Sequence, residues 1–402
     1  MPVVLTMLSG TGGGRVDFAR GVTYMFCLSR TILSPELFLM EHFSAYSHSA
    51  LPYRHVAVFR FSALGDVAMT VPVVYEVCRA YPGIRFTLFT KKTVAPLFVY
   101  PPDNLTVFPV DTKGRYRGFA GLWRLYRDMK SQGIDAIADL HNVLRTRVVG
   151  FFFAISGVKR AILDKGRAAK RRLVARKKPL PIQPLPTSFD RYRQVFALLG
   201  FETPKTFRSV FDDRHLPLPL PEGIESRREG EFWIGVAPFA KHEGKIYPLD
   251  RSESLVARLS QREDCRVFLM GGGGEEADLL GGWAEKYPRV VSLAGKRLGF
   301  AVELSMMSRM TLVVSMDSAN MHLASMVGTP VVSVWGQTHP YAGFLGWRQS
   351  KENIIQLSDL SCRPCSIFGN KPCYRGDYAC MQELSVERIW NRVEEILRRE
   401  KK

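Results

Sequence analysis

Polar residues that could bind an anion follow an apolar run in the last third of the chain. The stretch VVSMDSANMHLASMVG, residues 313–328, reads as a buried strand followed by a helix, with four polar residues at the join: Asp317, Ser318, Asn320 and His322. Asp317 or Ser318 can cap the first-turn N–H groups of such a helix. The same N–H groups and the helix dipole also attract phosphate. The spacing therefore predicts either an ordinary helix cap or one wall of a phosphate site.

An acidic residue in the first half of the chain occupies the same kind of position. In FRFSALGDVAMT, residues 59–70, a strand ends, Gly65 bends the loop and Asp66 starts a helix. A helix N-terminus favours the ionised carboxylate, and an ionised carboxylate at a cleft can act as a general base. The simpler interpretation is that Asp66 is an N-cap residue.

Two further loops at predicted strand ends carry residues suited to a nucleotide. Lys241 and Lys245 lie in APFAKHEGKIYP, and lysines at a cleft suit phosphate oxygens. The glycines of LMGGGGEE, residues 269–276, allow close backbone approach, and Glu275 or Glu276 could hold ribose hydroxyls, as acids do in dinucleotide folds. The glycine run does not have the G-x-G-x-x-G spacing, so on its own it is weak evidence for a nucleotide site.

The chain is strongly basic, with 56 Lys and Arg against 38 Asp and Glu, a net charge of +18. This surplus suits a polyanion: nucleic acid, an anionic membrane or a phosphorylated glycolipid. Much of it lies in DKGRAAKRRLVARKK, residues 164–178, which could equally be a solvated helix face. The sequence contains no recognisable nucleic-acid module, and its basic residues are not interleaved with aromatic ones, so we expect no nucleic-acid partner.

Residues 1–53 differ from the rest of the chain. Their glycine-rich stretch LSGTGGGR has no lysine at the spacing of a phosphate-binding loop. No convincing signal-peptide cleavage site follows, and no apolar run in the chain reaches the roughly 20 residues of a membrane span. We expect a poorly ordered N-terminal extension on a cytoplasmic protein.

From residue 54 onward, short apolar strands alternate with helices, such as the helix predicted over residues 66–82. This alternation is typical of α/β domains built on parallel sheets. The stretch 214–231, rich in proline, glycine and charge, is the predicted linker between domains at residues 54–213 and 232–402. Because ligands bind at the carboxyl ends of such strands, the polar loops should meet in a cleft between the two domains.

Four cysteines are clustered with the spacing C-x2-C-x7-C-x6-C in the segment 362–380, ahead of a predicted C-terminal helix. Four thiolates at this spacing could hold a structural zinc ion. Reduced thiols or a redox-labile pair are the alternatives, because the cytoplasm disfavours disulfides. The cysteines are Cys362, Cys365, Cys373 and Cys380.

Two of these segments, RFSALGDVAMTVPVV and SMDSANMHLASMVGTPVVSVWGQTHP, resemble the hallmark segments of glycosyltransferase family 9, the ADP-heptose:lipopolysaccharide heptosyltransferases. The resemblance runs roughly from residue 55 to residue 397. It implies the GT-B fold, in which two Rossmann-like domains with parallel sheets face each other across a cleft. It also implies that the C-terminal domain binds most of the nucleotide-sugar donor, that transfer inverts the sugar, and that no metal is needed.

The resemblance also implies roles for individual residues. Asp66 matches the catalytic base, and Lys245 matches a lysine on the donor phosphates. Glu275 and Leu298 fall near positions that contact ribose and adenine. The remaining donor-binding positions are Lys241, Asp317, Ser318, Ala319 and His322. Ala319 replaces the family's usual glycine, and Gln337 and His339 alter a following GPTDP run. These departures bear on which donor fits more than on the fold.

The acceptor should bind in the N-terminal domain. The residues expected there are Ser62, Lys165, Arg167, Lys170, Arg171 and Arg172. The resulting prediction is transfer of heptose from ADP-heptose to a lipopolysaccharide core or lipid A-type acceptor by a cytoplasmic monomer associated peripherally with the inner membrane. Two alternatives stay open: another nucleotide-sugar donor for surface polysaccharide synthesis, and a non-catalytic polyanion-binding protein.

Overall fold

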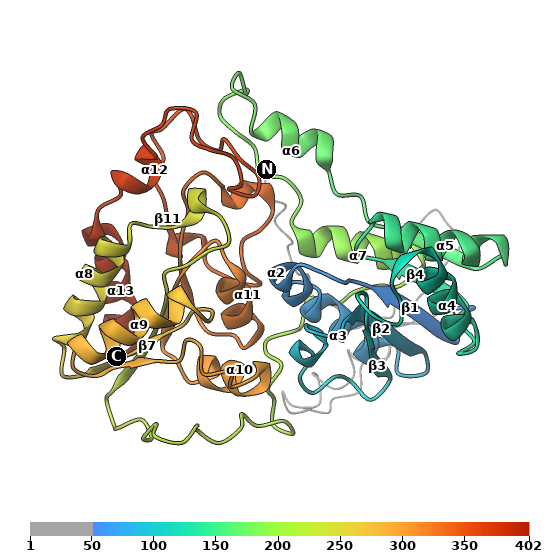
Figure 1. Cartoon of the computed structure of the whole chain (residues 1–402), viewed down its shortest axis with the longest axis horizontal. Helices are drawn as coiled ribbons and strands as arrows, with labels where there is room; N and C mark the ends of the chain where they lie inside the picture. The colour runs from blue at the N-terminus through green and yellow to red at the C-terminus, as the bar shows by residue number, and fades with distance from the viewer. Residues whose placement is uncertain (1–50, 402) are drawn as a thin grey trace, which may run out of the picture. The chain divides into compact units, whose positions relative to one another are not determined.

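Two parallel β-sheets, with helices on both faces, form the framework of the computed structural model, which describes residues 51–401 (Figure 1). The extension predicted over residues 1–53 therefore lies almost wholly outside the described residues. From Pro52 onward the chain forms one compact unit. Among residues 51–401 no helix is both long and apolar enough to cross a membrane.

The first sheet has five strands in the order β3-β2-β1-β4-β5. Its central strand, β1, is buried along its whole length, as expected of an apolar parallel strand covered on both faces. Val58 in β1 lies opposite Leu88 on one side and Ala138 on the other. The strands are β1 (His55–Phe59), β2 (Arg85–Lys91), β3 (Leu105–Val110), β4 (Ala136–Asp139) and β5 (Lys159–Ile162).

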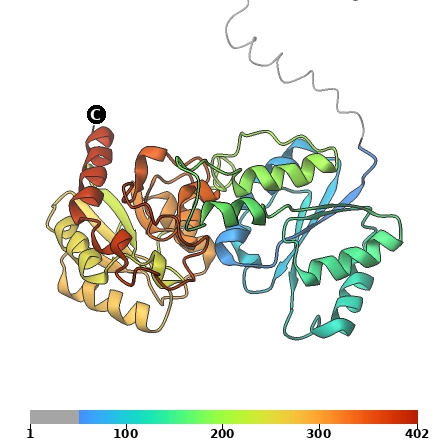
Figure 2. The ribbon, with the colours of Figure 1, turned by 90° about the horizontal axis from the view of Figure 1, so that it is seen from above.

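Helices cover both faces of this sheet. Figure 2 shows α4 (Gly118–Lys130) and α5 (Leu144–Ile155) on one face and α7 (Ser188–Leu198) on the other. The α4–α5 face encloses a core of aromatic and aliphatic side chains that includes Phe59 and Phe153. The short helix α6 (Arg167–Leu173) carries part of the basic run.

The helix predicted over residues 66–82 is interrupted. It forms α2 (Leu64–Ala68) and α3 (Val71–Ala80), with Thr70 as the N-cap of the second helix. Pro72 lies in the first turn of α3, where its missing N–H costs no hydrogen bond, whereas in the middle of one long helix it would remove one. The break leaves α2 as a separate turn directly after β1.

The second sheet has six strands in the order β11-β10-β9-β6-β7-β8. Renumbered from β6, this is the 3-2-1-4-5-6 order of dinucleotide-binding folds, in which ligands bind where the strand order reverses. That point lies between β6 and β9. The strands are β6 (Phe232–Ala237), β7 (Cys265–Leu269), β8 (Val290–Ser292), β9 (Leu312–Met316), β10 (Val331–Val334) and β11 (Ile354–Ile355).

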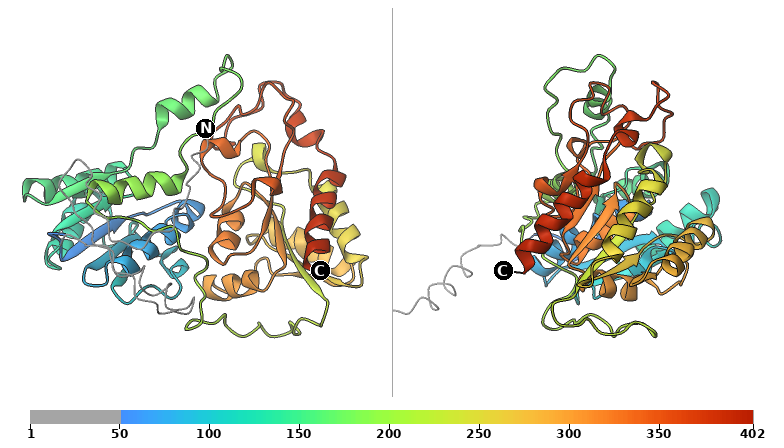
Figure 3. Two further views of the ribbon diagram at one scale, coloured as in Figure 1. Left: turned by 180° about the vertical axis from the view of Figure 1, so that it is seen from behind. Right: turned by 90° about the vertical axis from the view of Figure 1, so that its left-hand side faces the viewer.

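The C-terminal helix α13 (Val386–Glu400) completes the second sheet's covering layer. Ile389, Val393, Ile396 and Leu397 are buried at helical spacing. Figure 3 shows this helix alongside α8 (Leu249–Ser260), which it contacts. The other helices of this half are α9 (Glu275–Lys286), α10 (Phe300–Ser308), α11 (Ala319–Met326) and α12 (Ala379–Gln382). The predicted linker, residues 214–231, contains no helix or strand.

Candidate active site

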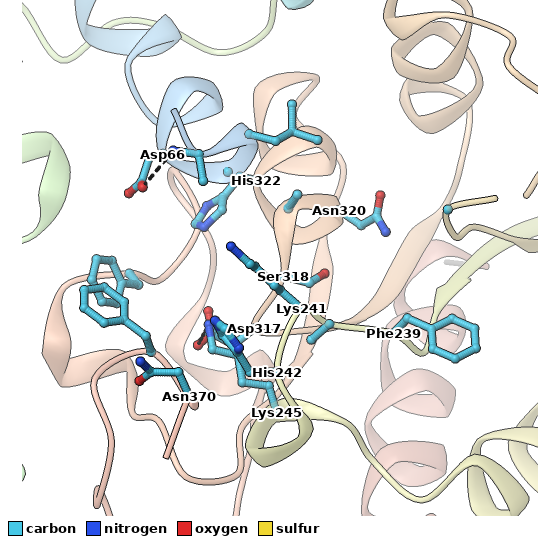
Figure 4. Close-up of a pocket in the computed structure, with 18 of the residues that line it drawn as sticks. Asp66, Phe239, Lys241, His242, Lys245, Asp317, Ser318, Asn320, His322 and Asn370 are labelled. Atoms are coloured by element: carbon cyan, nitrogen blue, oxygen red, sulfur yellow. Dashed lines mark hydrogen bonds and ion pairs between the residues drawn. The ribbon is translucent and has the colours of Figure 1, made fainter. Parts of the chain in front are cut away.

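The loops that follow β1, β6 and β9 line one cavity of about 550 Å³ (Figure 4). Each loop leaves the carboxyl end of a strand at the point where the strand order of its sheet reverses, which is where such folds bind ligands. A cavity of this volume is in the range of small-molecule sites. Its polar lining comprises Asp66, Lys241, His242, Lys245, Glu276, Asp317, Ser318, Asn320, His322 and Asn370.

The N-terminus of α11 opens into this cavity without a capping side chain. Ser318 is the N-cap residue, but its hydroxyl accepts no N–H from the helix and lies 3.2 Å from the Ser315 hydroxyl instead. The side-chain cap predicted from the sequence is therefore absent from this helix. Its first-turn N–H groups have no partner within the helix, so they are available to an anion. Ala319 begins the helix without a positive φ, so its β-carbon fits where a glycine was expected.

Lys245 and Asp317 form an ion pair at the base of the cavity, with 2.9 Å between Nζ and Oδ2. The Asp317 side chain is only 4% exposed, and its Oδ2 accepts no well-directed hydrogen bond. A buried carboxylate needs such a counter-charge. Lys245 ends the 3-10 turn η2 (Glu243–Lys245), while Lys241 is more exposed at the cavity wall. The predicted phosphate lysines thus lie beside the N-terminus of α11.

Gln337 fixes the loop that carries Lys245. Its backbone N–H donates to the carbonyl of Gly244 at 3.0 Å. A β-carbon on Gly244 would lie 2.0 Å from Gln337 Oε1, so only glycine allows this approach. The departure from the family pattern at Gln337 therefore lies beneath the lysine loop, outside the residues that line the cavity. His339, the other departure, accepts a hydrogen bond from the Tyr341 N–H on Nδ1.

Arg363, which sequence reasoning missed, holds the segment that follows β10. Its buried guanidinium donates to the carbonyls of Trp335, Thr338 and Leu357 at 3.0, 3.0 and 2.6 Å. These carbonyls come from loops on both sides of β11, so Arg363 ties the Gln337 segment to the Cys-rich segment. An arginine between two cysteines gave no sequence signal for this role.

His322 lies where the two halves of the site touch. It is buried, and burial is the main cause that lowers its pKa to about 4, so the ring is neutral near pH 7. Its Nδ1 has no hydrogen-bond partner. A β-carbon on Gly65 would lie 2.9 Å from His322 Cδ2, so the glycine allows α2 to pack closely against α11. The two motif-bearing loops are therefore in direct contact.

Asp66 faces the cavity from the first turn of α2. Its Oδ2 accepts the backbone N–H of Ala63 at 3.2 Å and pairs with Arg60 Nη2 at 2.8 Å. The Asp66 side chain is 37% exposed, so a substrate can reach it, whereas Arg60 is buried and also donates to the Leu140 carbonyl. Sequence reasoning missed Arg60, although a charged residue between two buried phenylalanines at the end of β1 signals a buried partner.

The nucleotide positions taken from the family pattern are not all at the cavity. Lys241, Lys245, Asp317, Ser318, Ala319 and His322 line it. Glu275 and Leu298 do not. Glu276 lines the cavity instead, and its carboxylate accepts the Gly272 N–H at 2.6 Å. Phe368 and Asn370, from the Cys-rich segment, also line it and were not anticipated, because nothing in their local sequence indicates a site.

A second cavity of about 650 Å³ also reaches Asp66. Four of the residues predicted to bind the acceptor line it, namely Lys165, Arg167, Lys170 and Arg171, while Ser62 and Arg172 do not. Two unpredicted cations, Arg60 and Arg191, complete its basic wall, and Phe344, Ile367 and Phe368 supply apolar surface. Burial, followed by the charge of Arg191, lowers the pKa of Lys170 to about 8. The Lys170 ammonium also lies 4.3 Å from the Phe344 ring centre.

The cysteine cluster does not form a recognisable metal centre. Cys362, Cys365, Cys373 and Cys380 are all free thiols. Throughout residues 51–401, no group of three or more His, Cys, Asp or Glu side chains is placed to hold a metal ion. Burial raises the pKa of Cys380 to about 12, which favours the protonated thiol. The zinc prediction therefore has no support in this geometry.

Comparison with known proteins agrees with this architecture. Residues 122–371 match the model of glycosyltransferase family 9 (heptosyltransferase). Lipopolysaccharide heptosyltransferase 1 of Pseudomonas aeruginosa is 26% identical over 320 residues, which cover 77% of this chain and 85% of the relative. Lipopolysaccharide core heptosyltransferase OpsX of Haemophilus influenzae is 22% identical over 298 residues, which cover 71% of this chain and 80% of the relative.

Solved structures show the same fold. The family 9 glycosyltransferase of Veillonella parvula superposes with a TM-score of 0.65 at 19% identity, covering 87% of this chain and 98% of its own. The structure of the E. coli heptosyltransferase WaaC with ADP superposes with a TM-score of 0.60 at 18% identity. The match covers 85% of this chain and 99% of the WaaC chain. The fold is GT-B, as the resemblance implied. The family match spans most of the described chain, and we conclude that this protein is a glycosyltransferase of family 9, the heptosyltransferase family.

Proposed function

We propose that the chain transfers heptose from ADP-heptose to a sugar of the lipopolysaccharide core on a lipid A-type acceptor, with inversion at the anomeric carbon and without a metal ion. One observation carries this proposal: Asp66 opens onto the same cavity as Lys245 and the uncapped N-terminus of α11. A base and an anion site that share one cavity can serve a hydroxyl nucleophile and a diphosphate leaving group. The lipopolysaccharide heptosyltransferases among the relatives support this choice of sugar and acceptor.

In the proposed reaction Asp66 accepts the proton of the acceptor hydroxyl. The hydroxyl oxygen then forms a bond to the anomeric carbon as the bond from that carbon to the diphosphate oxygen breaks, and ADP leaves. The ion pair with Arg60 keeps the Asp66 carboxylate oriented towards the cavity. Attack from the side of Asp66, opposite the diphosphate, gives inversion.

The negative charge that develops on the diphosphate is stabilised by groups already placed around it. Lys245 Nζ has three N–H donors and uses one direction for Asp317, so further donors remain for phosphate oxygens. Lys241 adds a second positive charge, and the first-turn N–H groups of α11 add aligned dipoles. His322 is neutral near pH 7 and can donate through one ring N–H. These groups supply the charge that a metal ion provides in other transferases.

The second cavity is the proposed acceptor site. Its wall of Lys165, Lys170, Arg171 and Arg191 suits phosphate or carboxylate groups, and its aromatic residues suit the faces of sugar rings. Because both cavities are built from one chain, a monomer suffices. We place the enzyme at the cytoplasmic surface of the inner membrane, where a lipid-linked acceptor is accessible.

The choice of nucleotide can be tested by thermal unfolding of the purified chain. At a concentration about 100 times its Kd, a bound nucleotide stabilises the folded state by about 2.7 kcal/mol. ADP should therefore raise Tm by several degrees, and by more than GDP or UDP at equal concentration. The variant Lys245→Gln should lose this shift, whereas Lys296→Gln, which changes a lysine outside the cavity, should keep it. A larger shift with UDP would reject ADP-heptose as donor and leave the fold unaffected.

Removing positive charges from the proposed acceptor cavity should weaken binding of the acceptor and leave binding of the donor unchanged. Lys170→Gln combined with Arg171→Gln should raise the acceptor KM about tenfold or more, because each removes a charged hydrogen-bond donor. The donor KM should stay unchanged. Arg172→Gln is a matched control, since Arg172 lies on the same helix but does not line the cavity. Steady-state kinetics with each substrate varied in turn measures both constants. A rise in the donor KM alone would show that this cavity does not bind the acceptor.

A further inference from the structure

Helices α4 and α5 present large apolar side chains to solvent. Leu144 is 78% exposed, Ile155 71% and Phe119 69%, and Phe151 and Trp123 are also exposed. We call these five residues the α4–α5 apolar surface. Single exposed apolar residues are ordinary on a protein, but adjacent ones mark an interaction site.

Helix α5 is apolar on two faces. Val149 and Phe153 are buried in the core of the first sheet. Leu144, Phe151 and Ile155, spaced by seven and four residues, lie on another stripe that is exposed. A helix that only covers a sheet needs one apolar stripe, so the second stripe is not explained by folding.

The exposed residues of α4 and those of α5 form one continuous surface. The half-buried ring of Phe152 joins the two helices, because its centre lies 6.1 Å from that of Phe119 and 5.0 Å from that of Trp123. Phe151 lies next to it, with 6.3 Å between ring centres. Figure 2 shows the two helices side by side on the same face of the first sheet.

The charge around this surface is mostly positive, with Asp111 and Asp128 as the acids nearest to it in the sequence of α4 and the turn before it. Exposed cations lie on the same two helices and in the segments that flank them: Arg115, Arg117, Arg124, Arg127, Lys130, Arg147 and Lys159. Asp128, the acidic residue within α4, is already paired with Arg115 at 2.9 Å. The sequence contains no glutamate between Glu76 and Glu202. Aromatic and aliphatic side chains within a basic surround are the pattern of proteins that lie on anionic membranes.

We propose that the α4–α5 apolar surface docks onto an anionic lipid bilayer. The rings of Phe119, Trp123 and Phe151 enter the headgroup region, and the surrounding arginines and lysines contact lipid phosphates. A second copy of this chain is a poorer occupant, because pairing two such surfaces would bring like charges together. The inference extends the proposed function, in that a lipid-linked acceptor needs an enzyme at a membrane. Docking itself requires neither donor nor acceptor.

Vesicle sedimentation of the full-length chain, without substrates, tests the proposal. The chain should bind vesicles that contain phosphatidylglycerol and should bind neutral phosphatidylcholine vesicles much more weakly. The triple variant Phe119→Ser, Phe151→Ser, Ile155→Ser should weaken binding to the anionic vesicles about tenfold or more. The double variant Leu198→Ser, Leu216→Ser is the control, because it removes exposed leucines that lie outside the α4–α5 apolar surface. Circular dichroism melting should show both variants folded, since all the replaced side chains are exposed.

Three results would overturn the proposal: equal binding of the triple variant and the parent chain, equal binding of neutral and anionic vesicles, or sedimentation velocity that shows a dimer abolished by the triple substitution. Failure of the proposed function would look different. In that case anionic vesicles would still bind through this surface, while a detergent-solubilised acceptor would receive no heptose from the parent chain. If both inferences hold, the triple variant should transfer heptose to the detergent-solubilised acceptor at the parent rate.

Discussion

Replacing Asp66 with Asn should lower kcat by about 10²–10⁴-fold, the usual contribution of a general base, and should leave the affinity for ADP unchanged. The amide has nearly the shape of the carboxylate but cannot accept the proton of an acceptor hydroxyl. Asp66 lines the cavity from the first sheet's side and pairs with Arg60, whereas the lysines proposed to hold the diphosphate belong to the second sheet's loops. Donor binding and proton removal should therefore separate in this variant.

Asp103→Asn provides the matched control, because Asp103 is an exposed acid that lines neither cavity. It should retain the parent rate. Single-turnover transfer and nucleotide titration, measured on the same preparations, give the two quantities needed. If Asp66→Asn transfers heptose at the parent rate, another group is the base. If it loses nucleotide affinity as well, Asp66 contributes to donor binding.

The second large effect is a loss of stability in mild acid. Burial is the main cause that lowers the pKa of His141 to about 3 and those of His322 and His339 to about 4. In the unfolded chain each histidine binds a proton near pH 6.5. Between pH 6.5 and 4 the unfolded state therefore holds more protons than the folded state, so the free energy of unfolding falls as pH falls. The total change is on the order of 10 kcal/mol if the three act independently.

Urea unfolding followed by tryptophan fluorescence should show this as a much lower midpoint at pH 5 than at pH 7.5. His141 shows the cause directly, since its Nδ1 accepts the Phe61 N–H at 3.3 Å and cannot do so once protonated. His141→Gln should reduce the difference between the two midpoints. His215→Gln should not, because the His215 ring is partly exposed instead of buried. Equal midpoints at the two pH values for the parent chain would contradict the buried neutral state of these rings.

The sequence predicts the fold well because the central strands of a parallel sheet are buried on both faces and so form apolar runs that can be recognised locally. β1 and β9 are examples, with every residue buried. The ends of these strands then identify the loops of Asp66, Lys245 and Asp317, which the structure brings to one cavity. The break between α2 and α3 is also encoded locally, because Pro72 fits the first turn of a helix and would cost a hydrogen bond inside a longer one.

Other features depend on contacts between residues far apart in the chain. Arg60 donates to the Leu140 carbonyl, 80 positions away in the chain. Its role beside Asp66 can therefore be recognised only once the folded structure brings these residues together. The choice between Glu275 and Glu276 depends on which side of α9 faces the cavity. The basic run of residues 164–178 can be recognised from its composition alone. Which of its side chains line the cavity depends on the fold, since Lys170 does and Arg172 does not. Sequence patterns identify elements and their ends, whereas side-chain direction needs the packed neighbours.

The most direct measurement of the central claim is the product formed by the purified full-length chain from ADP-heptose and a lipopolysaccharide acceptor that lacks heptose. The expected result is release of one ADP per acceptor, an increase in acceptor mass by one heptose, and an NMR coupling pattern that shows the anomeric configuration opposite to that of the donor. Absence of ADP release from ADP-heptose, with turnover of a different nucleotide sugar on the same acceptor, would contradict the account.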